Sequence, residues 1–215
     1  MCTHMKTMLL KPENYYTQRN NPTVRDNDFE LVGDVQCMPT SRVMFYIAAG
    51  IKWDNPTDLP DDAYFASLLI TNEAINFAYM KYPWAFKDGK GVIPPNEIHG
   101  MYGSWLDEKV TGKRRTDFKL SLLWKDFVYQ VNVLKRPVMT SGRYPGIGGH
   151  ATVFVGYDTK TKELRNVDPY GNPHLAYKGD AGAKGYDIRY NKEYFNEHIK
   201  RSDLKWGHVL FEEKI

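Results

Sequence analysis

The amino-acid sequence predicts an α+β fold in which N-terminal helices pack on a C-terminal antiparallel sheet. Three observations lead to this prediction: the composition is globular, apolar residues recur at helical spacing in the first half, and they alternate with polar residues in the second half. The 215 residues are 42% hydrophobic, 14% aromatic and 26% charged, which excludes an intrinsically disordered chain. Because no internal repeat is visible, we expect a single domain over 1–215, in which a second methionine, Met5, marks 1–4 as a candidate cloning remnant.

The predicted helices occupy most of the first half. Apolar residues at helical spacing predict one helix directly after Cys37 and a second helix that begins at Pro60 and runs to about Met80. The same spacing continues over 118–134, which predicts further helix there. A short helix is also expected over 191–199, before the last strand.

The predicted strands begin at Pro137, where the apolar period changes to two. Alternating apolar and polar residues predict strands over 137–141, 151–157, 164–168, 186–190 and 206–211. Two stretches rich in Gly and Pro, 88–95 and 141–149, are loop-sized and are expected to connect elements within the domain. Helices followed by strands are typical of an α+β domain in which the helices pack on one side of an antiparallel sheet.

Charge and hydropathy exclude several classes of protein. Lys and Arg number 29 and Asp and Glu 26, so the formal net charge of +3 is too small to indicate nucleic-acid binding, although it suits a polyanionic surface. The longest apolar stretches, such as 43–49, fall far short of the roughly 20 residues of a transmembrane helix, and the N-terminus has no apolar core of signal-peptide length. The two cysteines, Cys2 and Cys37, argue against a disulfide framework.

Cys37 is the first candidate for chemistry. It lies just before the first predicted helix, with Pro39 two residues later, where the missing N–H of proline costs nothing. The positive end of a helix stabilises a thiolate, so the pKa of Cys37 should be lowered if a histidine is also close. The alternative is a buried structural cysteine.

His150 and Asp168 are the next candidates. His150 begins an alternating strand after a glycine-rich approach, and Asp168 ends the following strand. If a five-residue loop over 158–162 joins the two strands, Tyr157 pairs with Glu163, and His150 and Asp168 share one face about 7–8 Å apart. Asp168 then holds the tautomer of the His150 ring. A four-residue loop would instead place His150 and Asp168 on opposite faces. The alternative interpretation is an ordinary strand histidine and a turn-forming aspartate.

A cysteine at a helix start, a later histidine at a strand start and an aspartate 18 residues after it (168 minus 150) follow the order of a papain-like triad. At these residues the chain resembles the double-glycine-leader (bacteriocin-processing) cysteine peptidases and their stand-alone relatives in bacteria and phages. The matching segments are 15–18, 37–41, 149–158 and 167–171, and the resemblance covers the chain from about residue 13 onward. It implies a papain-like cysteine peptidase fold.

The resemblance also implies a role for each residue. Cys37 is the nucleophile, His150 the general base and then acid, and Asp168 the residue that orients His150. Gln18, in the sequence Tyr-Tyr-Thr-Gln, supplies the side-chain amide of the oxyanion hole, with Gln36 as the alternative. The chain departs from the family pattern in two ways: a methionine follows the cysteine where a small residue is usual, and the interval from the glutamine to the cysteine is long.

No cofactor is required by this chemistry. Alternating acids at Asp26, Asp28 and Glu30 match a calcium loop in part, but Leu31 stands at the sixth position, where that loop needs glycine. A solvated loop is therefore the favoured interpretation, and calcium binding the alternative. Four further histidines show no paired metal-ligand spacing, which argues against zinc: His99, His174, His198 and His208.

The predicted function is hydrolysis of amide bonds in bacterial peptidoglycan, by an endopeptidase or amidase of the phage-endolysin kind. A peptidase directed at proteins or leader peptides is one alternative, and a catalytically inactive binding module of the same fold is another. A basic run over 109–119 is expected to be a charged surface, with attraction to wall polyanions as the alternative. We expect a monomer that has no nucleic-acid partner and stays in the cytoplasm until it is released to the cell wall.

Overall fold

The chain is built around one antiparallel sheet. The computed structural model describes residues 7–26, 29–81, 86–87, 90–91, 96–120, 122–144, 146–178, 184–200 and 206–211. Six strands follow the order β10-β9-β8-β7-β11-β6, and β1 pairs with β8 outside this order. The strands are β1 (Thr7–Met8), β6 (Thr116–Leu120), β7 (Val138–Tyr144), β8 (Gly148–Asp158), β9 (Glu163–Val167), β10 (Ile188–Tyr190) and β11 (Trp206–Leu210).

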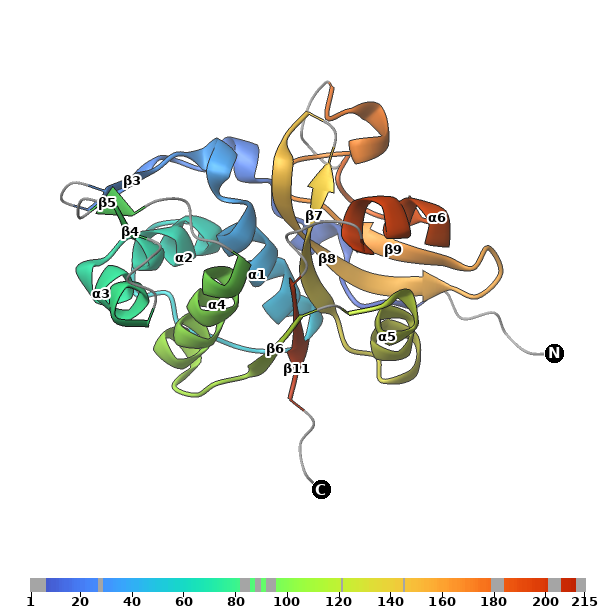
Figure 1. The fold of residues 1–215 in the computed structure, drawn as a ribbon, viewed down its shortest axis with the longest axis horizontal. Helices are drawn as coiled ribbons and strands as arrows, with labels where there is room; N and C mark the ends of the chain where they lie inside the picture. The colour runs from blue at the N-terminus through green and yellow to red at the C-terminus, as the bar shows by residue number, and fades with distance from the viewer. Residues whose placement is uncertain are drawn as a thin grey trace.

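Helices supply most of the first half of the chain, as the sequence predicts. The longer ones are α1 (Cys37–Ala48), α2 (Asp61–Leu69), α3 (Asn72–Lys81) and α4 (Asn96–Thr111), which gather on one side of the molecule in Figure 1. The shorter ones are α5 (Trp124–Val128), α6 (Lys192–Phe195), the π-helices η5 (Tyr129–Val133) and η7 (Asn196–Lys200), and the 3-10 helices η1 (Pro12–Asn14), η2 (Gln18–Asn20), η3 (Gly33–Val35) and η6 (Pro173–Leu175). Two small hairpins complete the fold, β2 (Val24–Asp26) with β3 (Phe29–Leu31) and β4 (Phe86–Lys87) with β5 (Lys90–Gly91).

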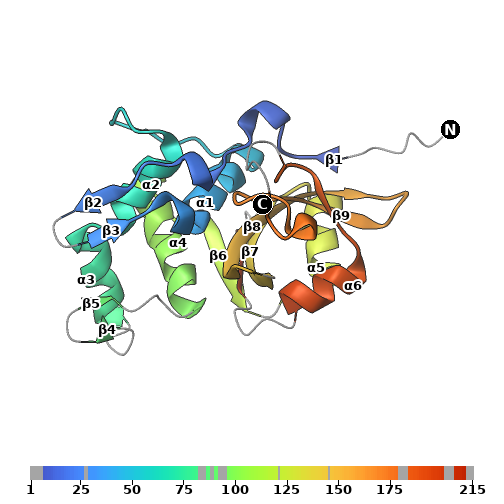
Figure 2. The ribbon, with the colours of Figure 1, turned by 90° about the horizontal axis from the view of Figure 1, so that it is seen from above.

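Helices cover both faces of the sheet, so the prediction that they lie on one side is wrong in part. α1 packs on β8 from one face, whereas α5 with η5 and α6 with η7 lie on the other side (Figure 2). The reason is that β8 is buried on both faces: Val153 and Val155 belong to the core around α1, and Phe154 and Tyr157 to the core around α5 and α6. A strand that is apolar on both faces needs a layer of helices on each.

The register between β8 and β9 differs from the predicted one at the loop and agrees with it near the site. Asp158 pairs with Glu163, so the loop has four residues rather than five. This shorter loop alone would place His150 and Asp168 on opposite faces of the sheet. A β-bulge between Phe154 and Gly156 adds one residue to β8, and Val153 pairs with Val167. The bulge therefore offsets the shorter loop, and beyond it the strands run in the register that the sequence analysis expects.

Other differences arise where distant segments pair. Phe118 lies in strand β6 rather than in a helix, because it pairs with His208 of β11, 90 residues away. The predicted helix over 60–80 is divided into α2 and α3, and the predicted loop over 141–149 shrinks to a turn because β7 and β8 extend into it. The predictions for 1–4 and most of 88–95 fall outside the described residues. Of the helices that the structure describes, none is long and apolar enough to cross a bilayer.

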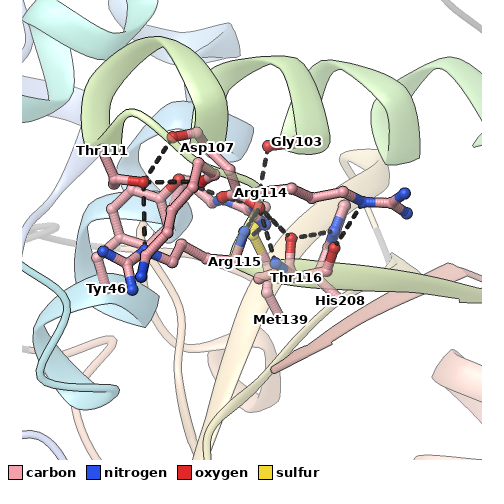
Figure 3. A network of polar contacts seen from close by, with 11 residues as sticks. Tyr46, Gly103, Asp107, Thr111, Arg114, Arg115, Thr116, Met139 and His208 are labelled. Atoms are coloured by element: carbon pink, nitrogen blue, oxygen red, sulfur yellow. Dashed lines mark hydrogen bonds and ion pairs between the residues drawn. The ribbon is translucent and has the colours of Figure 1, made fainter. Parts of the chain in front are cut away.

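A buried polar network joins α1 to the far edge of the sheet (Figure 3). The Arg42 guanidinium and the Tyr46 hydroxyl, both on α1, donate to the Asp107 carboxylate of α4. Thr116 of β6 donates to the same carboxylate from its backbone N–H (2.9 Å) and from its hydroxyl (2.6 Å). All four side chains are fully buried, and the hydroxyl of Thr116 lies 3.4 Å from Nδ1 of His208. The network fixes the helix that begins at the candidate nucleophile.

Candidate active site

Cys37 is the first residue of α1 and is partly exposed, with a free thiol. The preceding residue, Gln36, does not cap the helix with its side chain, so the positive end of α1 faces the thiol without a side-chain oxygen from that residue. One turn further, the Ser41 hydroxyl donates to the carbonyl oxygen of Ala151 (2.9 Å). This bond ties α1 to β8 directly beside His150.

The structure brings Cys37, His150 and Asp168 together. The His150 ring, at the start of β8, and the backbone of Ala151 both lie close enough to the Cys37 sulfur to stabilise its thiolate form. Nε2 of His150 lies 2.6 Å from Oδ1 of Asp168, and both of these side chains are buried. Because Nε2 faces the carboxylate, Nδ1 is the ring nitrogen left for the thiol.

The electrostatics of this group favour a thiolate beside an imidazolium. Burial alone would lower the pKa of His150, but the charge and hydrogen bond of Asp168, together with Cys37, raise it to about 10. Burial alone would raise the pKa of Cys37, but its hydrogen bond to His150, the charge of that ring and the bond to Ala151 lower it. Both shifts increase the share of the thiolate, which is the form that attacks carbonyl carbons.

Asp168 is held from several directions. Its Oδ1 also accepts the backbone N–H of Tyr170 (2.8 Å), and its Oδ2 accepts the Tyr177 hydroxyl (3.2 Å). Its backbone is fixed as well, since its carbonyl accepts the Tyr15 hydroxyl (2.8 Å) and its N–H donates to the Gly185 carbonyl (2.8 Å). The roles of Tyr177 and Gly185 beside Asp168 were not predicted from the sequence. Tyr15 lies in a segment that carries the family resemblance, so that segment could have pointed to it.

Gly185 has a steric requirement that no sequence pattern reveals. A Cβ at this position would lie 2.0 Å from the Asp168 carbonyl oxygen and 2.2 Å from the Tyr15 hydroxyl. Only glycine therefore allows the two backbones to approach this closely.

Gln18 is buried in η2 and is tied to the segments on either side of the site. Its Nε2 donates to the Asp34 carbonyl (2.6 Å), in the turn that leads into α1, and its backbone N–H donates to the Pro169 carbonyl (3.0 Å). A primary amide carries two N–H groups, so the bond to Asp34 leaves one of them for a further acceptor.

Gln36 is engaged elsewhere. Its Nε2 donates to the carbonyl oxygens of Pro22 and Leu31, both at 2.9 Å, and its Oε1 accepts from Asn21 (3.0 Å). Both amide hydrogens are thus used in holding the segment before α1. Of the two glutamines, Gln18 is therefore the one with an amide N–H left unused by these bonds.

The acidic segment before the nucleophile forms the hairpin of β2 and β3. Glu30 there pairs with Arg25, with Nε and Oε2 2.8 Å apart, and Asp28 falls outside the described residues. Within the described ranges, no group of three or more His, Cys, Asp or Glu side chains could hold a metal ion. Calcium binding stays an untested alternative.

A pocket of about 590 Å³ lies at the opposite end of α1 from Cys37. Its walls come from the segment after α1, from α2 and from the end of α4, with Trp53, Tyr64 and Lys109 among them. No residue of the candidate site lines it.

Comparison with known proteins gives little beyond this geometry. No protein-family model matches the chain, and no curated protein matches it in sequence. Among solved structures, the chain is similar to xylellain, a cysteine protease from Xylella fastidiosa, at 13% identity and a TM-score of 0.46. The alignment covers 97% of this chain and 86% of that one. A likeness at this level does not establish an activity, so the chemistry has to be inferred from the residues of the chain itself.

Proposed function

We propose that the chain is a cysteine hydrolase of amide bonds, with Cys37 as the nucleophile, His150 as the general base and acid, and Asp168 as the residue that orients His150. The observation that carries the proposal is the series of contacts from the Cys37 thiol to the His150 ring, whose Nε2 lies 2.6 Å from the Asp168 carboxylate. A buried structural cysteine would need no such partners, and the lowered pKa of Cys37 is the shift that a nucleophilic thiol requires.

The mechanism follows from these positions. The Cys37 thiolate bonds to the substrate carbonyl carbon, and the π electrons of the carbonyl move to its oxygen. The remaining N–H of the Gln18 amide and a backbone N–H at the start of α1 bind this oxyanion. On collapse of the intermediate the C–N bond breaks, and the leaving amine takes the proton of His150. Water, deprotonated by His150, then attacks the thioester and releases the carboxylic acid and the Cys37 thiolate.

For the substrate, we propose the peptide stems of bacterial peptidoglycan. The support is the resemblance of the segments around Gln18, Cys37, His150 and Asp168 to stand-alone relatives of the leader peptidases. The formal net charge of +3 is compatible with a polyanionic wall.

Loss of turbidity of purified cell walls tests the chemistry and the substrate together. Wild type should lyse the walls and release new amino and carboxyl ends in equal number, whereas Cys37→Ala should fold and leave the walls intact. Equal lysis by both proteins would refute the chemistry. A panel of protein and peptide substrates, digested in parallel and read by mass spectrometry, separates the substrate from the mechanism: cleavage of peptides alone, dependent on Cys37, would replace peptidoglycan with a peptide substrate.

A further inference from the structure

We propose that Tyr177 is a positioning residue, whose hydroxyl holds Asp168 in the orientation that His150 requires. The inference rests on the proposed function, since it concerns how the Cys37 and His150 pair is supported. It adds a residue that is in none of the segments carrying the family resemblance.

The first observation is the pattern of donors around the Asp168 carboxylate. Oδ1 receives both Nε2 of His150 (2.6 Å) and the N–H of Tyr170 (2.8 Å), whereas among the described residues the donor to Oδ2 is the Tyr177 hydroxyl (3.2 Å). The carboxylate is buried, so water does not readily replace a lost donor. The Tyr177 hydroxyl therefore fixes the rotation of the carboxylate about its Cβ–Cγ bond.

The second observation is the backbone that delivers Tyr177. After η6, Ala176 and Tyr177 both adopt left-handed conformations, with φ of 48° and 58°, which costs free energy for residues other than glycine. This pair turns the chain back towards Asp168, nine residues earlier (177 minus 168). The Tyr177 carbonyl is held in turn by Nη2 of Arg19 (2.8 Å). The fold maintains two strained residues at the point where the hydroxyl meets the carboxylate.

The third observation is that the same ring encloses His150. The ring centroids of Tyr177 and His150 are 6.0 Å apart at an interplanar angle of 78°, and Tyr170 and Tyr144 contact the histidine in similar edge-on geometry. Among the residues that the structure describes, the titratable groups that face the His150 ring are these three tyrosines, Cys37 and Asp168. Burial, with the charge of Asp168, raises the pKa of Tyr177 far above its usual value, so its hydroxyl stays protonated and acts as a donor.

The test compares Tyr177→Phe with a matched control, Tyr186→Phe. Tyr186 also donates one hydroxyl hydrogen bond, to the Leu10 carbonyl (2.8 Å), and no hydrogen bond joins it to Asp168. The rate of Cys37 alkylation by iodoacetamide is measured against pH on the full chain, and mass spectrometry of the Cys37 peptide separates it from the label on Cys2. This readout requires no knowledge of the substrate, and thermal unfolding checks that both variants keep their fold.

Without the Tyr177 hydroxyl the carboxylate turns away from His150, the imidazolium loses support, and the thiolate forms only at higher pH. We expect the rising limb of the alkylation profile to move up by about half a pH unit or more in Tyr177→Phe and to stay in place in Tyr186→Phe. With a cleavable substrate, kcat should fall about tenfold while KM changes less than about twofold. Loss of packing alone would lower the thermal midpoint without moving the limb.

Failure of the inference can be told from failure of the proposed function. Coincident profiles for wild type and Tyr177→Phe, or a limb that moves to lower pH, would overturn the role of Tyr177 and leave the proposed function standing. A wild-type Cys37 that reacts at pH 6 as slowly as a free cysteine would overturn both. A shift of equal size in Tyr186→Phe would also overturn the inference, since it would show that any lost tyrosine hydroxyl has this effect.

Discussion

Replacement of Asp107 by asparagine should destabilise the chain far more than loss of an ion pair on the surface. Asp107→Asn keeps the shape of the side chain but removes the negative charge that faces Arg42, and both residues are fully buried. Removing one partner of a buried ion pair costs about 3–5 kcal/mol. At roughly 2–4 °C per kcal/mol for a chain of this size, the thermal midpoint should fall by about 6–20 °C.

Two control variants set the scale for this experiment. Tyr46→Phe removes one hydroxyl donor to the same carboxylate and should cost about 1.5–3 kcal/mol, the usual contribution of a hydrogen bond to a charged group. Glu73→Gln breaks the pair with Lys109, whose side chains are 59% and 41% exposed, and should cost about 1 kcal/mol or less. The three free energies of unfolding are measured by urea denaturation with circular dichroism. A loss for Asp107→Asn no larger than that for Glu73→Gln would refute the view that this network anchors α1.

Three further predictions concern the site. The pH profile of kcat/KM should be bell-shaped, because the Cys37 thiol, whose pKa is lowered, must ionise and His150, whose pKa is raised to about 10, must keep its proton. Both limbs of the profile belong to the coupled pair. A rising limb at the pH of free cysteine would contradict this. Asp168→Ala should lower kcat by about 10²–10⁴-fold in steady-state assays while Cys37 remains modifiable, and unchanged kcat would remove Asp168 from the mechanism. Gly185→Ala should lower both kcat and the thermal midpoint, because the new Cβ pushes against the Asp168 carbonyl and the Tyr15 hydroxyl. A variant with wild-type values would show that these groups move away at no cost.

The second half of the chain shows how much of the strand arrangement an alternating sequence pattern predicts. Alternation predicts the strands that became β7, β8 and β9, and it places His150 and Asp168 on facing strands, within reach of each other. The predicted loop between β8 and β9 is one residue too long, and the correct register near the site depends on a bulge that the pattern does not contain. Bulges and loop lengths depend on how side chains pack on both faces of a strand, and the hydrophobic period of one strand does not predict them.

Periodicity and side-chain chemistry are local properties. The amino-acid sequence was therefore enough to predict the class of the fold, a helix next to Cys37, and the residue types capable of nucleophilic chemistry. The folded arrangement was needed to show that Gln36 binds backbone carbonyls while Gln18 keeps an amide hydrogen, that helices cover both faces of the sheet, and that Tyr177 returns to Asp168. These outcomes depend on which distant groups meet in a buried space, where each donor finds its acceptor after the chain has packed.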